Sequence, residues 1–290
     1  MAPILEVKNL THIYSAGTPF EHAALKDISF SVEPGEFIGV IGHTGSGKST
    51  LMQHLNGLLK PTGGTVLLGG KDIWSDKQLT RQSRFRVGLV FQYPEYQLFE
   101  ETVYKDIAFG PKNMGLTQEE IDRRVRESLA FVGMSENCLD KSPFDLSGGQ
   151  KRRVAIAGVL AMKPKIIVFD EPTAGLDPIG KATIFKAISE YRDKHNAVVI
   201  VVSHSMEDIA AVCDKVLVLN DGKLVSFGKT RDVFSESEKL KALGLNVPMI
   251  TNIFLELKRR YKGIDSNVLT VDEAVKALTP FIEKRRNKNA

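Results

Sequence analysis

The chain has 290 residues, of which 42% are hydrophobic and 26% are charged, and its formal net charge is +4. This composition is typical of a globular protein, and the length suits one large domain with an extra lobe, or two domains. The charge balance is too weak to indicate a nucleic-acid partner. No apolar run approaches the roughly 18–20 residues that span a bilayer, and no signal peptide is visible, so we expect neither feature. Cys138 and Cys213 lack metal-ligand spacing, which favours two partly buried free thiols in a reducing compartment.

Short strands dominate the first ninety residues. A loop containing Gly and Pro at 15–24 separates the first two strands, as in a hairpin. Between residues 49 and 59 the pattern predicts a helix, which ends before Pro61. The strands are expected at 4–10, 25–32, 36–42, 63–70 and 86–92.

Helical periodicity replaces the strand pattern over residues 93–164. Thr117 and Glu120 form a capping box ahead of an apolar helix face. A second helix is predicted from 149 to 162. We therefore expect a helical subdomain inserted into an α/β core. The apolar face after the capping box consists of Ile121, Val125 and Leu129.

Continuous apolar runs then return at 165–172 and 197–204. Runs this rich in β-branched residues are typical of strands that are buried on both faces of a parallel sheet. The helix predicted between them, over 179–195, completes a βαβ unit. A hairpin is expected over 215–228, around the favoured turn Asp221-Gly222.

The residues after Leu245 have apolar residues at helical spacing, and they predict a small helical appendage. A capping box at Thr270 and Glu273 marks the start of its second helix. Each helix has one apolar face, so we expect an interaction element, with dimer packing favoured over contact with a membrane surface. The two faces consist of Ile250, Ile253, Phe254, Leu257 and Tyr261, and of Val271, Ala274, Val275, Leu278, Phe281 and Ile282.

Residues 42–50 fit the phosphate-loop pattern G-x-x-x-x-G-K-[ST], and they lie between a predicted strand and a predicted helix, as the pattern requires. Glycines allow backbone N–H groups to wrap a phosphate, while Lys48 can reach the β- and γ-phosphates and the Ser49 hydroxyl can bind Mg²⁺. His43 occupies a variable position, for which the absence of a chemical role is favoured. The predicted loop consists of Gly42, His43, Thr44, Gly45, Ser46, Gly47, Lys48, Ser49 and Thr50.

Polar side chains at the ends of other predicted strands supply further groups that a nucleotide site needs. Asp170 ends a buried strand, where it can hold Mg²⁺, and Glu171 can act as general base on a water in line with the γ-phosphate. The competing interpretation is that these two acids cap the next helix. Gln92 follows another strand and can touch Mg²⁺ and the attacking water, whereas His204, also at a strand end, is of a type that is more often structural. All of them belong to the C-terminal edge of the parallel strands, where α/β sheets bind ligands.

A second candidate anion site is the stretch "LSGGQ" at 146–150, just before a predicted helix. Ser147 and two glycines leave the first helical N–H groups exposed and positively polarised, which is typical of an anion site. The chain therefore has two candidate phosphate sites about a hundred residues apart.

The loop at 42–50, Gln92, "LSGGQ", "VFDEPTAGLD" at 168–177 and His204 together resemble the nucleotide-binding subunit of ATP-binding cassette (ABC) proteins, over roughly residues 4–240. The resemblance implies an α/β P-loop NTPase fold and an ABC ATPase domain at 1–245. Its RecA-like parallel sheet core, with N-terminal antiparallel strands, would occupy about 1–92 and 165–245. A helical subdomain would occupy about 93–164, and a helical interaction element 246–290.

The resemblance also accounts for the second anion site. In this family two cassettes dimerise head to tail, and each ATP lies between the phosphate loop of one chain and the "LSGGQ" stretch of the other. It implies ATP hydrolysis, with Tyr14 stacked on adenine, although an aromatic residue there fits a core or surface role equally well. Asp177 would lie in the loop that links the two sites across the dimer. The implied site residues are Glu171, His204 and Gln92 for catalysis, Ser49, Gln92 and Asp170 for Mg²⁺, and Ser147, Gly148, Gly149 and Gln150 for ATP in trans.

Residues 17–28 and 91–115 resemble more closely the ATPases of energy-coupling factor (ECF) transporters, of the A-prime, CbiO-like type. This implies a subunit that powers the uptake of vitamins or other micronutrients from the cytoplasmic face of the cell membrane. The implied partners are a second ABC ATPase subunit, in a homo- or heterodimer, a transmembrane coupling protein and a substrate-binding membrane protein. An ABC importer or exporter of another type is the first alternative, and a soluble ABC ATPase is less favoured.

Aromatic residues and leucine gather at 93–104, a pattern that is enriched in buried interfaces, although packing between subdomains explains it equally well. Three acids lie among them and would meet basic residues of a membrane partner. The gathered residues are Tyr93, Tyr96, Leu98, Phe99 and Tyr104, with Glu95, Glu100 and Glu101.

Overall fold

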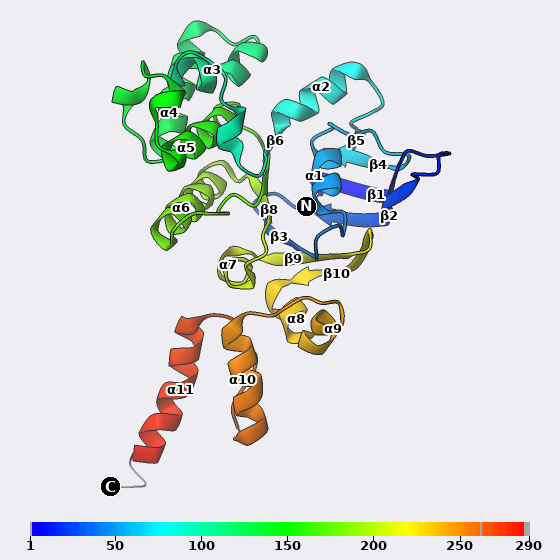
Figure 1. The fold of residues 1–290 in the computed structure, drawn as a ribbon, viewed down its shortest axis with the longest axis vertical. Coiled ribbons are helices and arrows are strands. Elements are labelled where there is room, and N and C mark those ends of the chain that lie inside the picture. Colours follow the sequence, from blue (N-terminus) through cyan, green and yellow to red (C-terminus); the bar gives the residue numbers. More distant parts are fainter. Residues whose placement is uncertain (1, 262, 287–290) are drawn as a thin grey trace.

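Within residues 2–261 and 263–286, which the computed structural model describes, ten strands form two β-sheets at the centre of the molecule (Figure 1). One sheet has the strand order β2-β1-β4-β5, and the other has the order β10-β9-β3-β8-β7-β6. The strands are β1 (Leu5–Tyr14), β2 (His22–Val32), β3 (Phe37–Ile41), β4 (Gly63–Leu68), β5 (Lys71–Asp72), β6 (Val87–Val90), β7 (Ile166–Asp170), β8 (Val198–Val202), β9 (Lys215–Asn220) and β10 (Lys223–Lys229).

Helices surround the sheets. The α-helices are α1 (Lys48–Leu55), α2 (Lys77–Arg86), α3 (Val103–Asn113), α4 (Gln118–Phe131), α5 (Gly148–Leu160), α6 (Pro178–His195), α7 (Met206–Val212), α8 (Thr230–Ser235), α9 (Ser237–Ala242), α10 (Met249–Arg260) and α11 (Val271–Arg286). Short 3-10 turns lie at η1 (Pro94–Gln97), η2 (Glu136–Cys138) and η3 (Pro143–Asp145).

The six-stranded sheet is parallel except for β10, which forms the predicted hairpin with β9. Its central strands are buried on both faces, as predicted: Phe37 and Ile41 of β3 face one apolar cluster, and Ile38 and Val40 face the other. Because β3, β8, β7 and β6 are parallel neighbours, their carboxyl ends meet at one edge. The predicted fold class, an α/β parallel core with N-terminal antiparallel strands, is confirmed.

Helix α1 packs Leu51 and Leu55 into the apolar cluster between the two sheets. The helix predicted over 49–59 is too long, since α1 ends at Leu55. The Asn56 side chain donates a hydrogen bond to the Val87 carbonyl, and Gly57 adopts a left-handed conformation with φ of 73°. These two residues end the helix well before Pro61, the residue that the sequence pattern favoured.

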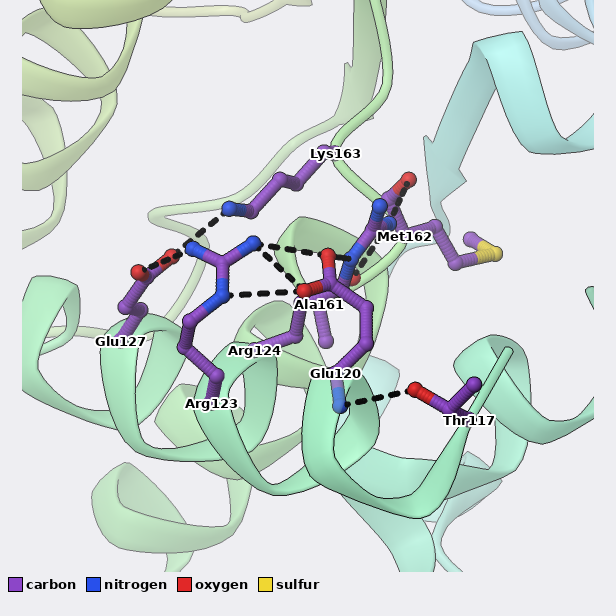
Figure 2. A network of polar contacts seen from close by, with 8 residues as sticks. All are labelled: Thr117, Glu120, Arg123, Arg124, Glu127, Ala161, Met162 and Lys163. Atoms are coloured by element: carbon purple, nitrogen blue, oxygen red, sulfur yellow. Dashed lines mark hydrogen bonds and ion pairs between the residues drawn. The ribbon is translucent and has the colours of Figure 1, made fainter.

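Helices α3, α4 and α5 form a separate helical group beside the sheet edge (Figure 1). Figure 2 shows the polar network that joins α4 to the end of α5. Thr117 accepts the Glu120 N–H at 3.4 Å and is the N-cap of α4, but the predicted capping box is only half formed, because the Glu120 carboxylate accepts from Arg123 and Arg124 instead of the Thr117 N–H. Arg124 bonds Glu120 at 2.6 Å and reaches the Met162 carbonyl at 3.1 Å. The carboxyl end of α5 is therefore hydrogen-bonded to a side chain of the neighbouring helix α4.

Helix α2 was not expected from the sequence. Asp76 caps it by accepting the Gln78 N–H at 3.2 Å. Its buried residues are the polar Thr80 and Ser83, so the segment has no apolar periodicity from which a helix could be predicted.

Helices α10 and α11 project from the end of the molecule away from α3–α5 (Figure 1). They share a small buried cluster of their own, centred on Phe254. The main core includes Val247, two residues past the predicted boundary at 245, and also Leu269, which lies just before α11. The apolar faces are only partly covered, and none of the helices in the described part of the chain is long and apolar enough to cross a membrane. The exposed face residues are Ile253, Tyr261, Val271, Val275 and Phe281, and the side chain of Ile282 lies outside the described residues.

Candidate nucleotide site

A cavity of about 480 Å³ lies where the parallel strands end. It brings together eleven of the residues predicted for a nucleotide site from five separate stretches of sequence. Those residues are Tyr14, Thr44, Gly45, Gly47, Lys48, Ser49, Thr50, Gln92, Asp170, Glu171 and His204, and the cavity is also lined by His22 and Ala24.

The phosphate loop joins the end of β3 to the start of α1. Gly47 has a φ of 99°, and a Cβ atom there would lie 2.5 Å from the Ala24 carbonyl oxygen. A Cβ at Gly45, which has a φ of 81°, would instead meet open space. The loop therefore needs glycine for its backbone path at both positions, and at Gly45 it leaves room over the backbone for a ligand.

Lys48 is the first residue of α1 and is 8% exposed. Its ammonium group donates to the carbonyls of Gly42 at 2.7 Å and His43 at 2.8 Å. Burial lowers the pKa of Lys48, and the nearby carboxylates of Glu171 and Asp170 oppose this shift. The amine is thus held inside the loop with hydrogen-bond partners that a phosphate oxygen can replace.

Ser49 and Asp170 approach each other across the cavity, although they lie 121 residues apart in sequence. The Ser49 hydroxyl donates to the Asp170 carboxylate at 2.9 Å. A hydroxyl and a carboxylate are oxygen donors of the kind that Mg²⁺ prefers, and Mg²⁺ commonly uses only one or two protein ligands beside phosphates and water. The donor set fits the ion, with the amide oxygen of Gln92 as a further oxygen donor on the same cavity wall.

Glu171 is held in a specific position by its backbone and by two side chains. Its φ is 52°, a left-handed conformation that is uncommon for a residue with a side chain, and its N–H donates to the Val202 carbonyl at 3.0 Å. One carboxylate oxygen lies 2.8 Å from His204 Nε2, and the other accepts from Gln92 at 3.4 Å. Strain of this kind is typical of functional positions.

The competing interpretation, in which the two acids cap the next helix, is wrong. Helix α6 begins at Pro178, and Asp177 is its N-cap, accepting the Gly180 N–H at 2.8 Å. Asp170 and Glu171 therefore remain available to the cavity. The link across a dimer that was expected of Asp177 stays a prediction, beside this capping role.

Tyr14 lies at the mouth of the cavity and is 38% exposed, so it is not a core residue. Its hydroxyl is 3.3 Å from the Thr50 hydroxyl, and its ring packs edge-on against His12 at 4.4 Å between centroids. His22 is the cross-strand partner of Tyr14 and lines the same cavity, but it was not identified from the sequence. The hairpin predicted around residues 15–24 was the signal that could have placed it opposite Tyr14.

Three residues of the predicted loop do not line the cavity. Gly42 contributes the carbonyl that Lys48 binds, and Ser46 is fully buried with no partner for its hydroxyl among the described residues. The His43 ring turns away, with Nδ1 2.7 Å from the Thr44 carbonyl and Nε2 2.8 Å from Asn220. This side chain links the loop to the end of β9, and the absence of a chemical role for His43 stays a prediction.

The "LSGGQ" stretch lies outside this cavity. Ser147 and Gln150 form a capping box at the start of α5, in which Gln150 accepts the Ser147 N–H at 2.9 Å and Ser147 accepts the Gln150 N–H at 3.4 Å. Ser147, Gly148 and Gly149 are exposed, and a Cβ atom at either glycine would meet open space. The open amino end of α5 is thus accessible to a group from another molecule.

Comparison with known proteins places the chain in a family. A family model described as "ABC transporter" matches residues 25–174. The chain is similar to the energy-coupling factor transporter ATP-binding protein EcfA2 of Caldanaerobacter subterraneus subspecies tengcongensis, with 55% identity over 98% of this chain and 99% of the relative. The protein of the same name from Clostridium perfringens is 51% identical, over 98% of this chain and 99% of the relative.

Solved structures agree with the relatives. The structure of cbiO1 from Clostridium perfringens, described as part of the ABC transporter complex cbiONQ, aligns with a TM-score of 0.74 and 39% identity, over 90% of this chain and 98% of that one. The ATP-binding cassette MJ0796, solved as a dimer bound to ADP and phosphate, aligns with a TM-score of 0.69 and 30% identity, over 78% and 98%. The chain therefore belongs to the ABC transporter family and, within it, to the ATP-binding proteins of energy-coupling factor transporters.

Proposed function

We propose that the chain is the ATP-hydrolysing subunit of an ECF-type importer and that the cavity at the ends of the parallel strands is its catalytic site. The observation that carries this proposal is the position of Glu171, fixed between His204 and Gln92 on the wall that Lys48 and Ser49 also line. The 45–55% identity with eight ECF transporter ATP-binding proteins supports the type of transporter.

In this proposal the phosphates of ATP occupy the loop that begins at Gly42. Lys48 exchanges its two carbonyl partners for the β- and γ-phosphates, so its positive charge moves toward the transferred group. Tyr14 stacks on the adenine at the mouth of the cavity. Ser49, Asp170 and Gln92 would hold Mg²⁺, which neutralises phosphate charge when it is bound.

Glu171 then acts as general base. Its carboxylate accepts a proton from a water that lies in line with the γ-phosphate, and His204 and Gln92 keep the carboxylate oriented. His204 is placed to stabilise charge on the γ-phosphate after it has released its contact with Glu171. The carboxylate of Glu171, held between His204 and Gln92 on the cavity wall, supports hydrolysis over storage of nucleotide.

We propose that this site is completed by a second cassette subunit. The amino end of α5, with the exposed Ser147, Gly148 and Gly149 and the half-buried Gln150, does not line its own cavity, so it is available to the γ-phosphate held by the other chain. The dimer of the similar cassette MJ0796 with ADP and phosphate supports such an assembly. Asp177, in the loop after Glu171, would connect the two composite sites.

The segment after Gln92 provides a surface for the membrane partners. Tyr96 and Phe99 are 84% and 60% exposed, and Phe99 lines a largely apolar groove of about 460 Å³. Leu98 and Tyr104 are mostly covered and instead serve packing. Glu95, which was expected to meet basic residues of a partner, is wrongly assigned, because it forms an internal ion pair with Arg152.

We infer that this surface binds a transmembrane coupling protein, which joins the ATPase to a substrate-binding membrane protein for vitamins or other micronutrients. The chain would then be a peripheral protein of the cytoplasmic face of the cell membrane, with no nucleic-acid partner. The name of cbiO1 as part of an ABC transporter complex supports a membrane-associated assembly of this kind.

The test is purification of the tagged chain from membranes in mild detergent, followed by identification of its partners by mass spectrometry and measurement of ATP hydrolysis. The proposal expects a second cassette protein, at least one multi-spanning membrane protein and ATPase activity that Glu171→Gln removes. Recovery with ribosomes or DNA, and without membrane proteins, would contradict it. The matched control is the same preparation carrying Glu190→Gln, since Glu190 is an exposed carboxylate on α6, away from the cavity.

A further inference from the structure

Arg152 is a buried cation in the second turn of α5. It is only 4% exposed, and its partners come from two segments that are far from it in sequence. The guanidinium makes two parallel hydrogen bonds with the Glu95 carboxylate, at 2.9 and 3.0 Å. Its remaining nitrogen donates to the carbonyls of Ala174 at 2.6 Å and Pro172 at 3.4 Å. One side chain therefore joins three segments.

Each of the three segments carries a different part of the proposed function. Helix α5 is capped by the exposed Ser147, and Glu95 lies in η1, three residues after Gln92 and next in sequence to the exposed Tyr96. Pro172 and Ala174 belong to the loop that follows Glu171. Arg152 itself does not line the nucleotide cavity, so it has no direct contact with a ligand there.

The ion pair is charged on both sides. Burial alone would raise the pKa of Glu95, but the hydrogen bonds and the positive charge of Arg152 outweigh burial, and the pKa of Glu95 is lowered. A bidentate contact between a guanidinium and a carboxylate fixes the orientation of both planes. Lysine cannot reproduce this geometry, because its ammonium is a single point of charge.

The same guanidinium also contacts the hinge of the exposed segment. The centroid of the Tyr93 ring lies 5.8 Å from it, within range of a cation–π interaction, and Tyr93 has a left-handed φ of 53°. The chain therefore turns sharply between Gln92, which contacts Glu171, and Glu95, which contacts Arg152. A displacement of η1 is opposed at both of these contacts.

We propose that Arg152 is a positioning residue that makes the exposed segment at 93–99, the amino end of α5 and the loop after Glu171 move as one unit. A partner that displaces the exposed segment would thereby shift Ser147 toward or away from the ATP of the opposing chain. The inference rests on the proposed function only in assigning that exposed segment to a membrane partner, because the mechanical link itself is a property of this chain.

The test uses the full chain with its cassette partner, in the Glu171→Gln background, which holds ATP without turnover. Arg152→Gln and Glu95→Gln each remove one side of the ion pair, and the double variant removes both. The matched control is Arg153→Gln, because Arg153 is the next residue on the same helix and makes no hydrogen bond or ion pair with the described residues. ATP is the probe, and sedimentation and hydrogen-exchange mass spectrometry are the measurements.

We expect ATP binding by the separate chain to stay within about twofold of its starting value, while ATP-dependent dimerisation weakens by about 10-fold, within the usual range of coupling between sites. The double variant should weaken dimerisation no more than Arg152→Gln alone, because both changes remove one interaction. In the parent protein ATP should alter hydrogen exchange at 93–99 and 146–151 together. In Arg152→Gln the change at 93–99 should be lost.

Three results would overturn the proposal. The first is that Arg153→Gln weakens ATP-dependent dimerisation as much as Arg152→Gln does. The second is that the effects of Arg152→Gln and Glu95→Gln on dimerisation add up in the double variant. The third is that ATP still alters hydrogen exchange at 93–99 and 146–151 together in Arg152→Gln. A variant that merely lowers stability would increase exchange in every segment and lower the unfolding temperature. If Arg152→Gln does not fold, Glu95→Gln decides the question, since it leaves the Ala174 contact in place. Failure of the proposed function would be seen in a different measurement, because Lys48→Ala would then bind ATP with normal affinity.

Discussion

Replacement of Glu171 by glutamine isolates the chemical step from nucleotide binding. The amide has the same shape as the carboxylate, so it can still accept a hydrogen bond from His204, which lies 2.8 Å away. Gln92 can rotate its own amide to suit the new NH₂ group. The change therefore removes the ability to take a proton and leaves the packing of the site intact.

The expected effect is a fall in kcat of about 10²-fold or more, the scale of a general-base contribution. ATP affinity should be maintained or slightly increased, because the loss of one carboxylate near Lys48 makes the cavity more positive. Phosphate release measures turnover, and equilibrium binding of a fluorescent ATP analogue measures affinity. Turnover equal to that of the Glu190→Gln control would refute the role of Glu171 and transfer it to His204.

Three further predictions concern Lys48, His54 and the C-terminal helices. Lys48→Ala should reduce ATP affinity in calorimetry by about 10- to 100-fold, the value of hydrogen bonds to a charged group, and unchanged affinity would contradict the assignment. Burial lowers the pKa of His54 to about 4, so the unfolded chain binds a proton first as pH falls below 6.5. Stability should thus be full above pH 6.5 and decline by about 3 kcal/mol toward pH 4, a loss that denaturant unfolding should show to be smaller in His54→Phe. A chain that ends after Val247 should fold, with an unfolding transition lowered by the loss of Leu269 from the core and of the Arg231–Glu273 ion pair, but should sediment as a weaker dimer; unchanged association would contradict the role of the C-terminal helices.

The cavity could be predicted from the sequence because its residues follow strands. Asp170 and Gln92 lie at the ends of apolar runs that predict strands, and the ends of neighbouring parallel strands meet at one edge. The sequence also placed Lys48 and Ser49 in a loop whose glycines and position are characteristic of phosphate binding. Side chains that lie far apart in the chain, such as Ser49 and Asp170, were thereby expected to meet, and they do.

Two kinds of feature were not predicted. The link from Arg152 to Glu95 and Ala174 depends on tertiary packing, and no local pattern distinguishes Arg152 from the neighbouring Arg153. Glu95, read as an exposed acid, is paired inside the protein for the same reason. The capping box of Ser147 and Gln150 is different, because its spacing was visible in the sequence and was overlooked beside the anion-site interpretation.

The most direct test of the central claim uses Ser147, the N-cap of α5. Ser147→Asp and Ser147→Asn both preserve the cap, but only aspartate places a negative charge where the γ-phosphate of the opposing chain would lie. In the Glu171→Gln background, sedimentation with and without ATP and the cassette partner measures closure, and calorimetry on the separate chain measures binding. The account predicts that Ser147→Asp binds ATP with the affinity of Ser147→Asn but forms no ATP-dependent dimer. Loss of ATP binding by the separate chain, or dimerisation equal to that of Ser147→Asn, would contradict it.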